Sequence, residues 1–383
     1  MTSGTPPRAR ADVLLCPGPV MLSPGVKAAL ARCEIGHRDA RFSELVARLR
    51  RNCGLVLGAN EGHSVVFITG PATAAIEAAC VSLLPPDASV IVPLNGTFGA
   101  RIAEILKVHG VPCIPIDFGF GKPFDLARIE AALADPRHAG FPAALAMTHH
   151  ETSAGLLNPV AEVCALARRH GLRTLVDATS SAGAEDLNVT RDGIDVCITS
   201  SGKCLHAPPG IAVVCVRRDM LAARVGAAPR SYSLDLLRHH DQLEANSQTP
   251  FTPAVPQFVA LDRAVEELLE EGVAERHRSY LRRRAFLAAG LRRLGLPLLR
   301  LPAGSEACSV LTVEVPRPLD LDALYWSMRE QGYVIYRAKA PLAPHYFQLG
   351  VMGELSESDL SGFLEGLESL LFRPAGGRRA VTA

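Results

Sequence analysis

Short apolar runs alternate with amphipathic stretches through the middle of the chain. The apolar runs are rich in Val and Ile and are mostly apolar throughout, which is typical of strands covered on both faces. We expect such strands at 65–69, 89–93, 143–148, 173–176, 196–199 and 211–216. Helical patterns lie between several of them, including 74–84 and 158–170, where Asn158 is the expected N-cap, Pro159 starts the first turn and Gly171 ends the helix. This order predicts an α/β fold with a mainly parallel sheet and crossover helices.

The pattern changes after about Pro256. An amphipathic helix is predicted over 257–272 and an arginine-rich helix over 275–294, with Gly295 as its stop. Strand patterns follow at 309–315 and 333–336. We therefore expect a large domain over 21–255 and a smaller α+β domain over 256–373, with residues 1–20 joining the small domain and 374–383 forming a flexible tail.

Charge and cysteine usage narrow the class of protein. The 40 basic and 39 acidic residues give a net charge of +1, which disfavours a nucleic-acid binder or a polybasic membrane anchor. No apolar run approaches the roughly 20 residues of a membrane helix, and the first residues lack a signal-peptide pattern. The ten cysteines are scattered without a CxxC pair, so we expect reduced thiols in a cytoplasmic protein and no zinc site.

Lysine is rare in this chain, which makes each one informative. Only five of the 40 basic residues are lysines, and arginine cannot replace a lysine that must act as a neutral amine. Lys203 follows one predicted strand, and Asp177 ends the strand before it, at the edge where α/β folds bind ligands. An amine beside a carboxylate suits pyridoxal phosphate, which needs a lysine for its Schiff base and an acid at its pyridine nitrogen. The alternative is a surface lysine and a helix-capping aspartate.

A turn of small residues offers a place for the phosphate. Gly70, Pro71, Ala72 and Thr73 connect a predicted strand to a predicted helix, and a helix N-terminus presents free N–H groups to an anion. Many strand–helix turns look alike, so this signal is weak alone.

Further motifs carry a resemblance that spans 14–371. The chain resembles the class V aminotransferases of pyridoxal-phosphate fold type I, and especially the branch that acts on aminoalkylphosphonates. The segments that carry the similarity are LCPGP at 15–19, NGTFGAR at 95–101, HHETSAG at 149–155, VDA at 176–178, KC at 203–204, PG at 209–210, RSYSLDL at 230–236, FTP at 251–253 and GYVIY at 332–336.

The resemblance implies a fold, a cofactor and a set of roles. It implies a fold type I transferase, with a seven-stranded type of sheet in its large domain, that is a homodimer with shared sites. Lys203 would form the internal aldimine with pyridoxal 5'-phosphate and then move the proton as general base. The other implied cofactor contacts are Asp177 at the pyridinium nitrogen, Phe98 on the ring face, Thr152 at the phenolic edge, Ala72 and Thr73 at the phosphate, and Thr252 reaching the phosphate from the partner subunit.

The chain departs from the family pattern mainly where substrate anions bind. Gln348 stands where the family has a carboxylate-binding arginine, and Pro250 replaces a second arginine of the phosphonate branch. Arg337 is a cation gained beside the retained Lys339, so we hypothesise that Arg337, with Lys339, contacts the substrate anion. At the phosphate turn, Pro71 has no N–H to donate.

These residues predict a transaminase that works by a ping-pong route. It would move an amino group from a primary amine, such as 2-aminoethylphosphonate, to a 2-oxo acid such as pyruvate. One alternative is a class V lyase or an aminotransferase with an altered substrate. Another is a non-catalytic binding protein built on the same fold.

Overall fold

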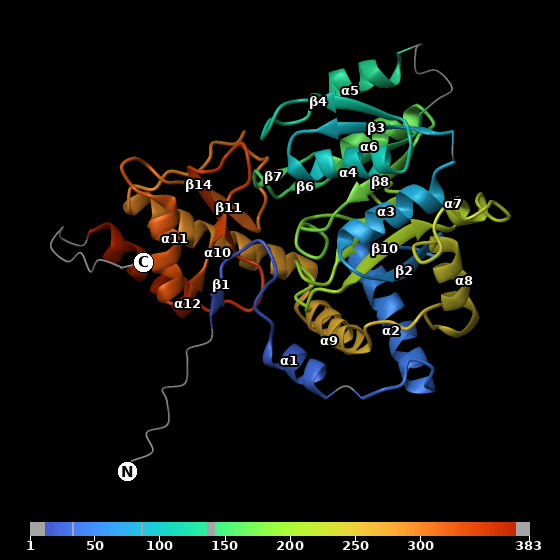
Figure 1. Cartoon of the computed structure of the whole chain (residues 1–383), viewed down its shortest axis with the longest axis horizontal. Helices are drawn as coiled ribbons and strands as arrows, with labels where there is room; N and C mark the ends of the chain where they lie inside the picture. The colour runs from blue at the N-terminus through green and yellow to red at the C-terminus, as the bar shows by residue number, and fades with distance from the viewer. Residues whose placement is uncertain (1–11, 33, 86, 136–141, 373–383) are drawn as a thin grey trace.

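A seven-stranded sheet forms the larger of the two lobes (Figure 1). The computed structural model describes residues 12–32, 34–85, 87–135 and 142–372. Strand β10 is antiparallel to both of its neighbours, and the other strand pairs are parallel, so the predicted mainly parallel sheet is confirmed. In spatial order the strands are β2 (His63–Thr69), β10 (Ile211–Arg217), β9 (Val196–Ser200), β8 (Arg173–Asp177), β5 (Pro142–Thr148), β3 (Ser89–Leu94) and β4 (Cys113–Asp117).

The hydrophobic pattern locates six of these strands to within two residues at each end. The seventh, β4, was not predicted. It lies at the edge of the sheet, is only partly buried and contains Pro115. An edge strand buries less side-chain surface and tolerates proline, so its apolar signal is weak.

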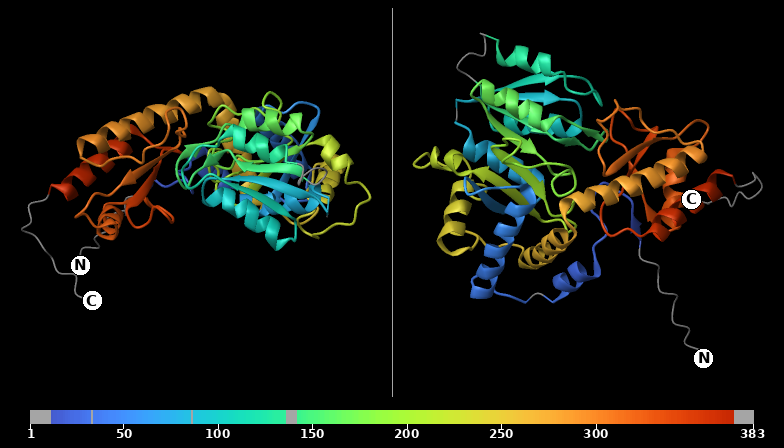
Figure 2. Two further views of the ribbon diagram at one scale, coloured as in Figure 1. Left: turned by 90° about the horizontal axis from the view of Figure 1, so that it is seen from above. Right: turned by 180° about the vertical axis from the view of Figure 1, so that it is seen from behind.

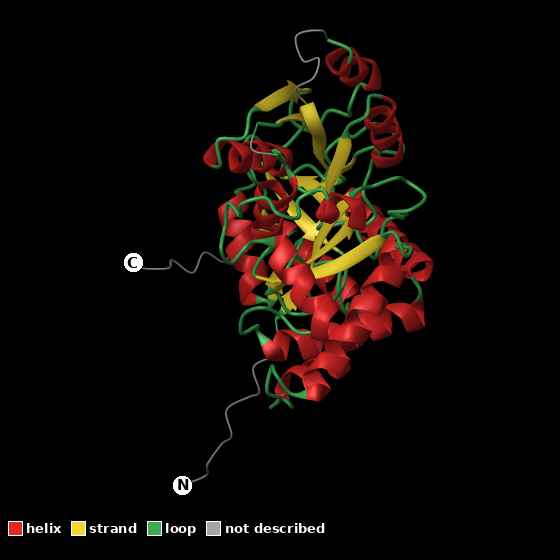
Figure 3. Cartoon of the chain, turned by 90° about the vertical axis from the view of Figure 1, so that its right-hand side faces the viewer, coloured by secondary structure: helices red, strands yellow, loops and turns green. Residues whose placement is uncertain are grey.

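Helices pack on both sides of this sheet, as the red and yellow elements of Figure 3 show. They include the predicted crossover helices, which cover the apolar faces of the strands. Their bounds are α1 (Pro24–Ala31), α2 (Ala40–Leu57), α3 (Ala72–Leu83), α4 (Thr97–Val108), α5 (Leu126–Leu133), α6 (Val160–Arg169), α7 (Arg218–Ala222), α8 (Leu236–Asn246) and α9 (Val255–Glu271).

The predicted start of α6 is wrong. Pro159 occupies the N-cap position, and no side chain caps this helix. The Asn158 amide instead donates to Thr148 O at 2.8 Å and accepts from Asn95 Nδ2 at 2.7 Å. The Asn158 side chain therefore belongs to a buried hydrogen-bond network between loops. The predicted stop at Gly171 agrees with its positive φ of 72° directly after the helix.

The smaller lobe is built from the last third of the chain and the segment around β1. A three-stranded antiparallel sheet has the order β11 (Val310–Glu314), β14 (Tyr346–Gly350), β13 (Tyr336–Arg337). The helices α10 (Val273–Arg293), α11 (Leu321–Glu330) and α12 (Glu357–Leu371) complete this lobe, and α10 runs along its length (Figure 2). Separately, β1 (Val13–Leu14) pairs in parallel with β12 (Tyr333–Val334), and β6 (His150–Glu151) pairs with β7 (Leu156–Leu157). The single strand predicted at 333–336 is thus wrong, because β12 and β13 belong to different sheets.

The described residues form two hydrophobic cores, which distinguish the two lobes. Residues of α9, including Phe258 and Leu268, belong to the core of the large sheet, whereas Tyr280 of α10 belongs to the second core. We therefore propose that the domain boundary lies near Gly272 rather than at residue 256. The second core also contains Val13, Leu15 and Val20. The tail predicted at 374–383 lies outside the described residues.

The described residues carry no helix that is both long and apolar enough to cross a membrane. Within the same residues, the nine cysteines are free thiols, and eight of them are buried.

Candidate active site

The two side chains that the sequence pairs lie at neighbouring strand ends. Asp177 is the last residue of β8, and Lys203 follows the end of the adjacent parallel strand β9. Both line one cavity of about 290 Å³ at the carboxyl edge of the sheet. The predicted residues Ala72, Thr73, Phe98 and Thr152 line the same cavity. Of the predicted cofactor contacts, only Thr252 is not among its lining residues.

Lys203 is held under the loop that follows β1. Its Nζ donates a hydrogen bond to Pro17 O. A Cβ atom on Gly18 would lie 2.6 Å from Lys203 Cδ and 2.7 Å from Nζ, and Gly18 has a φ of +105°. Glycine is therefore required there both by space and by backbone conformation. Burial lowers the pKa of Lys203, because the ammonium form loses its water, and the nearby guanidinium of Arg101 lowers it further.

The Asp177 carboxylate is buried and already has donors on both oxygens. Oδ1 accepts from Thr179 N at 3.0 Å and from Thr179 Oγ1, and Oδ2 accepts from Arg101 Nη2 at 3.1 Å. A carboxylate has lone pairs for further donors. These contacts fix the Asp177 carboxylate where it can accept a hydrogen bond from a ligand in the cavity. Arg101 ends the motif NGTFGAR, but its contact with Asp177 was not predicted.

The phosphate turn has the predicted geometry. Helix α3 begins at Ala72 with Pro71 as its N-cap, and no side chain caps its first turn. The first N–H groups of a helix have no intrahelical partner, so those of Ala72 and Thr73 are available to an anion. The proline lies outside the helix and removes none of these donors. The missing N–H of Pro71 therefore removes no donor from the first turn of α3.

Three buried polar atoms at this cavity have no hydrogen-bond partner in the described structure. They are Arg101 Nε, Thr148 Oγ1 and His150 Nε2. Buried polar groups are rarely left without partners, and such groups gathered at one cavity indicate a polar ligand. With the free N–H groups, a lysine, an acid and an aromatic ring, this donor set fits pyridoxal phosphate. Sequence patterns could not reveal these orphan atoms, because they are defined by packing.

Glu151 supports the Phe98 side of the cavity. Its buried carboxylate accepts from Phe98 N and Gly99 N, each at 3.0 Å, and from Ser153 Oγ. These N–H groups belong to the first turn of α4, so the carboxylate caps this helix. Burial raises the pKa of Glu151, and the hydrogen bonds from Ser153, Gly99 and Phe98 oppose this rise. No role for Glu151 was predicted from the sequence, although the motif HHETSAG contains it.

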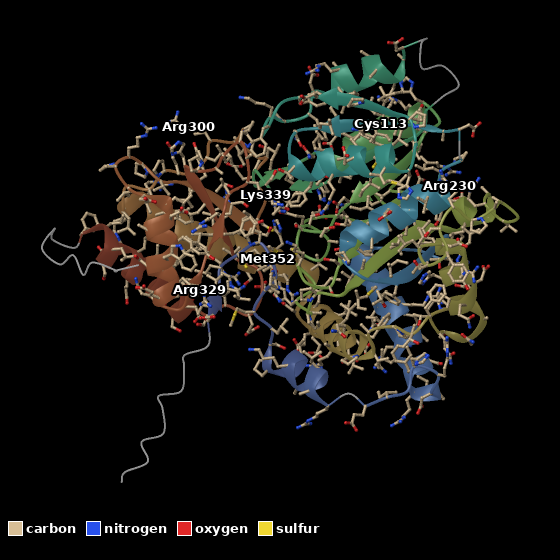
Figure 4. The ribbon with its side chains drawn as sticks, in the orientation of Figure 1. Cys113, Arg230, Arg300, Arg329, Lys339 and Met352 are labelled. Carbon is tan, nitrogen blue, oxygen red and sulfur yellow. The ribbon has the colours of Figure 1, made fainter. Side chains whose placement is uncertain are left out.

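A smaller outer pocket, of about 50 Å³, adjoins the cavity and is lined by Lys339, Gln348, Tyr336 and Ser153. It shares Lys203, Phe98, Thr152 and Gly18 with the main cavity. Lys339 Nζ lies 5.1 Å from the centre of the Phe98 ring, and Figure 4 shows Lys339 between the two lobes. The structure thus brings two of the three predicted substrate residues, Lys339 and Gln348, to the site.

Arg337 is directed elsewhere. Its guanidinium forms an ion pair of 3.0 Å with Asp322 and lies 4.2 Å from the centre of the Tyr325 ring. It lines neither the cavity nor the outer pocket. The hypothesis that Arg337 anchors the substrate therefore has no geometric support within one chain. Thr252 is exposed in one chain, and its predicted role depends on a partner subunit.

A larger cavity, of about 470 Å³, lies at the opposite edge of the sheet, between the start of β2 and the end of β10. It contains none of the predicted residues, and Arg217 on its wall is paired with Asp219. The cavity around Lys203 is therefore the candidate active site.

The sheet, with its lysine and acid at the carboxyl edge and the smaller second lobe, defines a fold type I pyridoxal-phosphate transferase. Residues 25–333 match the family model Aminotransferase class-V. The chain therefore belongs to the class V aminotransferase family and is classed as a transaminase. It is 35% identical over 365 residues to a 2-aminoethylphosphonate–pyruvate transaminase of Burkholderia pseudomallei, and the match covers 94% of this chain and 97% of that relative.

Solved structures share the fold over nearly the whole chain. A ureidoglycine–glyoxylate aminotransferase from Bacillus subtilis has a TM-score of 0.88 at 27% identity, covering 97% of this chain and 96% of that one. An alanine–glyoxylate aminotransferase from Nostoc sp. has a TM-score of 0.87 at 24% identity, covering 97% and 98% respectively. These enzymes have different substrates in their names, so the fold alone does not select the substrate.

Proposed function

We propose that this protein is a pyridoxal-phosphate-dependent aminotransferase that moves an amino group from 2-aminoethylphosphonate, or a related primary amine, to a 2-oxo acid such as pyruvate. The observation that carries the proposal is the pairing of Lys203 and Asp177 at one cavity that also holds three unpartnered buried polar atoms. The name of the relatives at 35% identity supports the choice of substrates.

In this proposal, each side chain of the cavity has a separate task. The N–H groups of Ala72 and Thr73 would hold the phosphate, Phe98 would cover the ring, and Asp177 would pair with the ring nitrogen. When bound, pyridoxal phosphate supplies an electron sink for the bond that breaks at the amino carbon. The lowered pKa of Lys203 favours a neutral amine, which can take the proton from that carbon and return it.

We further propose a homodimer with shared sites. Thr252 is exposed beside partly buried Phe251, whose ring lies 5.6 Å from the exposed Tyr232. These residues form an outer surface suited to contact a second copy, whose cavity Thr252 would reach. Light scattering of the cofactor-loaded protein tests this part: a monomer at micromolar concentration would contradict it.

The experiment that tests the function uses purified protein loaded with pyridoxal phosphate. We expect 2-aminoethylphosphonate to shift the cofactor absorption band without any acceptor, and alanine to form once pyruvate is added. Lys203→Ala should abolish both signals. Lys107→Ala, which changes an exposed lysine on α4, should abolish neither.

Other results would favour the alternatives. Release of a product from the amine in repeated turnover without an acceptor would indicate a lyase. A protein that binds the cofactor but responds to no amine would be a non-catalytic member of the fold. A response to amino acids alone would retain the aminotransferase proposal and reject the phosphonate.

A further inference from the structure

The Gln348 side chain is held in one orientation by Thr312 on the small sheet and by Thr152 in the turn between β6 and β7. Its Nε2 donates to Thr152 O at 2.7 Å and to Thr312 Oγ1 at 3.1 Å. Thr152 O can only accept. Thr312 Oγ1 donates its own proton to Ala154 O at 3.0 Å, so toward Gln348 it acts as an acceptor. The opposite amide orientation would place Oε1 against Thr152 O, two acceptors in contact. Both N–H protons of Gln348 are therefore used within the protein.

The Gln348 side chain consequently presents a hydrogen-bond acceptor, and no N–H donor, to the outer pocket. Because both N–H groups of Gln348 donate within the protein, the polar atom that it can offer a ligand is Oε1. The pocket's other polar groups include the ammonium of Lys339, and no ion pair among the described residues engages that lysine. Arg101, on the wall of the main cavity, is paired with Asp177. The hydroxyl groups of Thr152 and Ser153, which also line the pocket, donate to His150 O and to the Glu151 carboxylate. A ligand that lies between Lys339 and Gln348 therefore meets one cation and one hydrogen-bond acceptor.

We propose that the outer pocket selects substrates whose remote end is an acidic group that still carries a proton, such as a hydrogen phosphonate, over fully ionised anions. The charged oxygen of that group would face Lys339, and its P–OH would donate to Gln348 Oε1. This inference rests on the proposed function, because it concerns the end of the substrate farthest from Lys203.

The chemistry of the anions explains the selection. A phosphonate loses its second proton near neutral pH, as phosphate groups do at a pKa of about 6, so it can keep or regain a proton when it binds. A carboxylate has lost its only proton at about pH 4, and a sulfonate is fully ionised in water. Either of these would place an oxygen lone pair against Gln348 Oε1, and an unmatched buried acceptor is costly.

The test uses two unreactive probes that differ by one proton, ethylphosphonate and ethanesulfonate. Both lack the amine, have the same skeleton and can carry one negative charge. Calorimetry on the cofactor-loaded protein at pH 7 should show ethylphosphonate binding at least about tenfold tighter. Repeating the titration in two buffers of different ionisation enthalpy should show proton uptake with ethylphosphonate beyond that seen with ethanesulfonate.

Two variants separate the residues. Gln348→Arg replaces the acceptor with donors, so the preference should vanish and ethanesulfonate should bind more tightly than it does to the wild type. Lys339→Ala, at an exposed position, should weaken both probes while the ratio between them persists. Equal binding of the two probes to the wild type, no binding of either, or an unchanged ratio in a folded Gln348→Arg protein would each overturn the inference.

Failure here differs from failure of the proposed function. A preference for ethylphosphonate without amino transfer from 2-aminoethylphosphonate would support the pocket inference and reject the proposed reaction. Amino transfer from 2-aminoethylphosphonate with no preference between the probes would support the proposed reaction and reject the pocket inference.

Discussion

Replacing Gly18 with alanine tests whether the loop after β1 sets the position of Lys203. The new Cβ would lie within 3 Å of Lys203 Cδ, Lys203 Nζ and Gly202 O, at 2.6, 2.7 and 2.9 Å. An alanine at positive φ costs about 1–2 kcal/mol, and forced overpacking adds about 1–3 kcal/mol. We therefore expect Gly18→Ala to lower the free energy of unfolding by about 2–5 kcal/mol and to weaken pyridoxal phosphate binding at least tenfold.

Gly304→Ala is the matched control. Gly304 also has a positive φ, +81°, but a Cβ there would meet nothing within 4 Å. It should therefore lose only the backbone part, about 1–2 kcal/mol, and bind the cofactor normally. Urea unfolding gives the stabilities, and absorbance titration gives the cofactor affinity. If the two variants match in both measurements, the contact between Gly18 and Lys203 does not control the site.

Three further substitutions test other parts of the site. Glu151→Gln should destabilise the protein by about 2–3 kcal/mol in urea at pH 7. The neutral amide weakens the charge-assisted hydrogen bonds from the N–H groups of α4, and its Nε2 opposes Ser153 N, which donates to Oε1 at 3.3 Å. A loss below 1 kcal/mol would contradict the capping role. Burial lowers the pKa of His149 from 6.5 to about 3, so the unfolded chain binds a proton there that the folded chain does not, and stability falls as pH drops through this window. Between pH 7.5 and 5, His149 should lower the free energy of unfolding by about 2 kcal/mol. His149→Gln should reduce the fall in unfolding free energy over this pH range by that amount. An equally steep fall in the variant would refute the role of His149. Arg337→Ala should leave kcat/KM for every anionic amine within twofold, since Asp322 engages this guanidinium, and a tenfold drop would restore its predicted substrate role.

Much of the large domain could be predicted because its strands are covered on both faces. Residues 211–216 are apolar without interruption, and each is buried in β10. That pattern could not reveal that β10 runs antiparallel to its neighbours, since side chains on a strand covered on both faces look alike in either direction. Strand β4 was missed for the opposite reason, because an edge strand buries too little.

Some features of the candidate site could be predicted from the sequence, and others could not. Lys203 and Asp177 could be paired from residue type and position, and the structure places both at one cavity. The role of Gln348 depends on which acceptors surround its amide, and Thr152 and Thr312 come from distant parts of the chain. Arg337 shows the limit of the approach, because a cation gained in a motif carries no information on the direction of its side chain.

The pairing of β1 with β12 has a consequence for the order of events during synthesis. Val13 leaves the ribosome well before its partner, Tyr333, and can pair only when that distant segment has emerged. At the usual rates of translation the wait is on the order of tens of seconds. Gly350 N, from an even later segment, bonds Leu15 O. The loop that covers Lys203 thus closes late, and a nascent chain should be unable to retain the cofactor until its small lobe has been made.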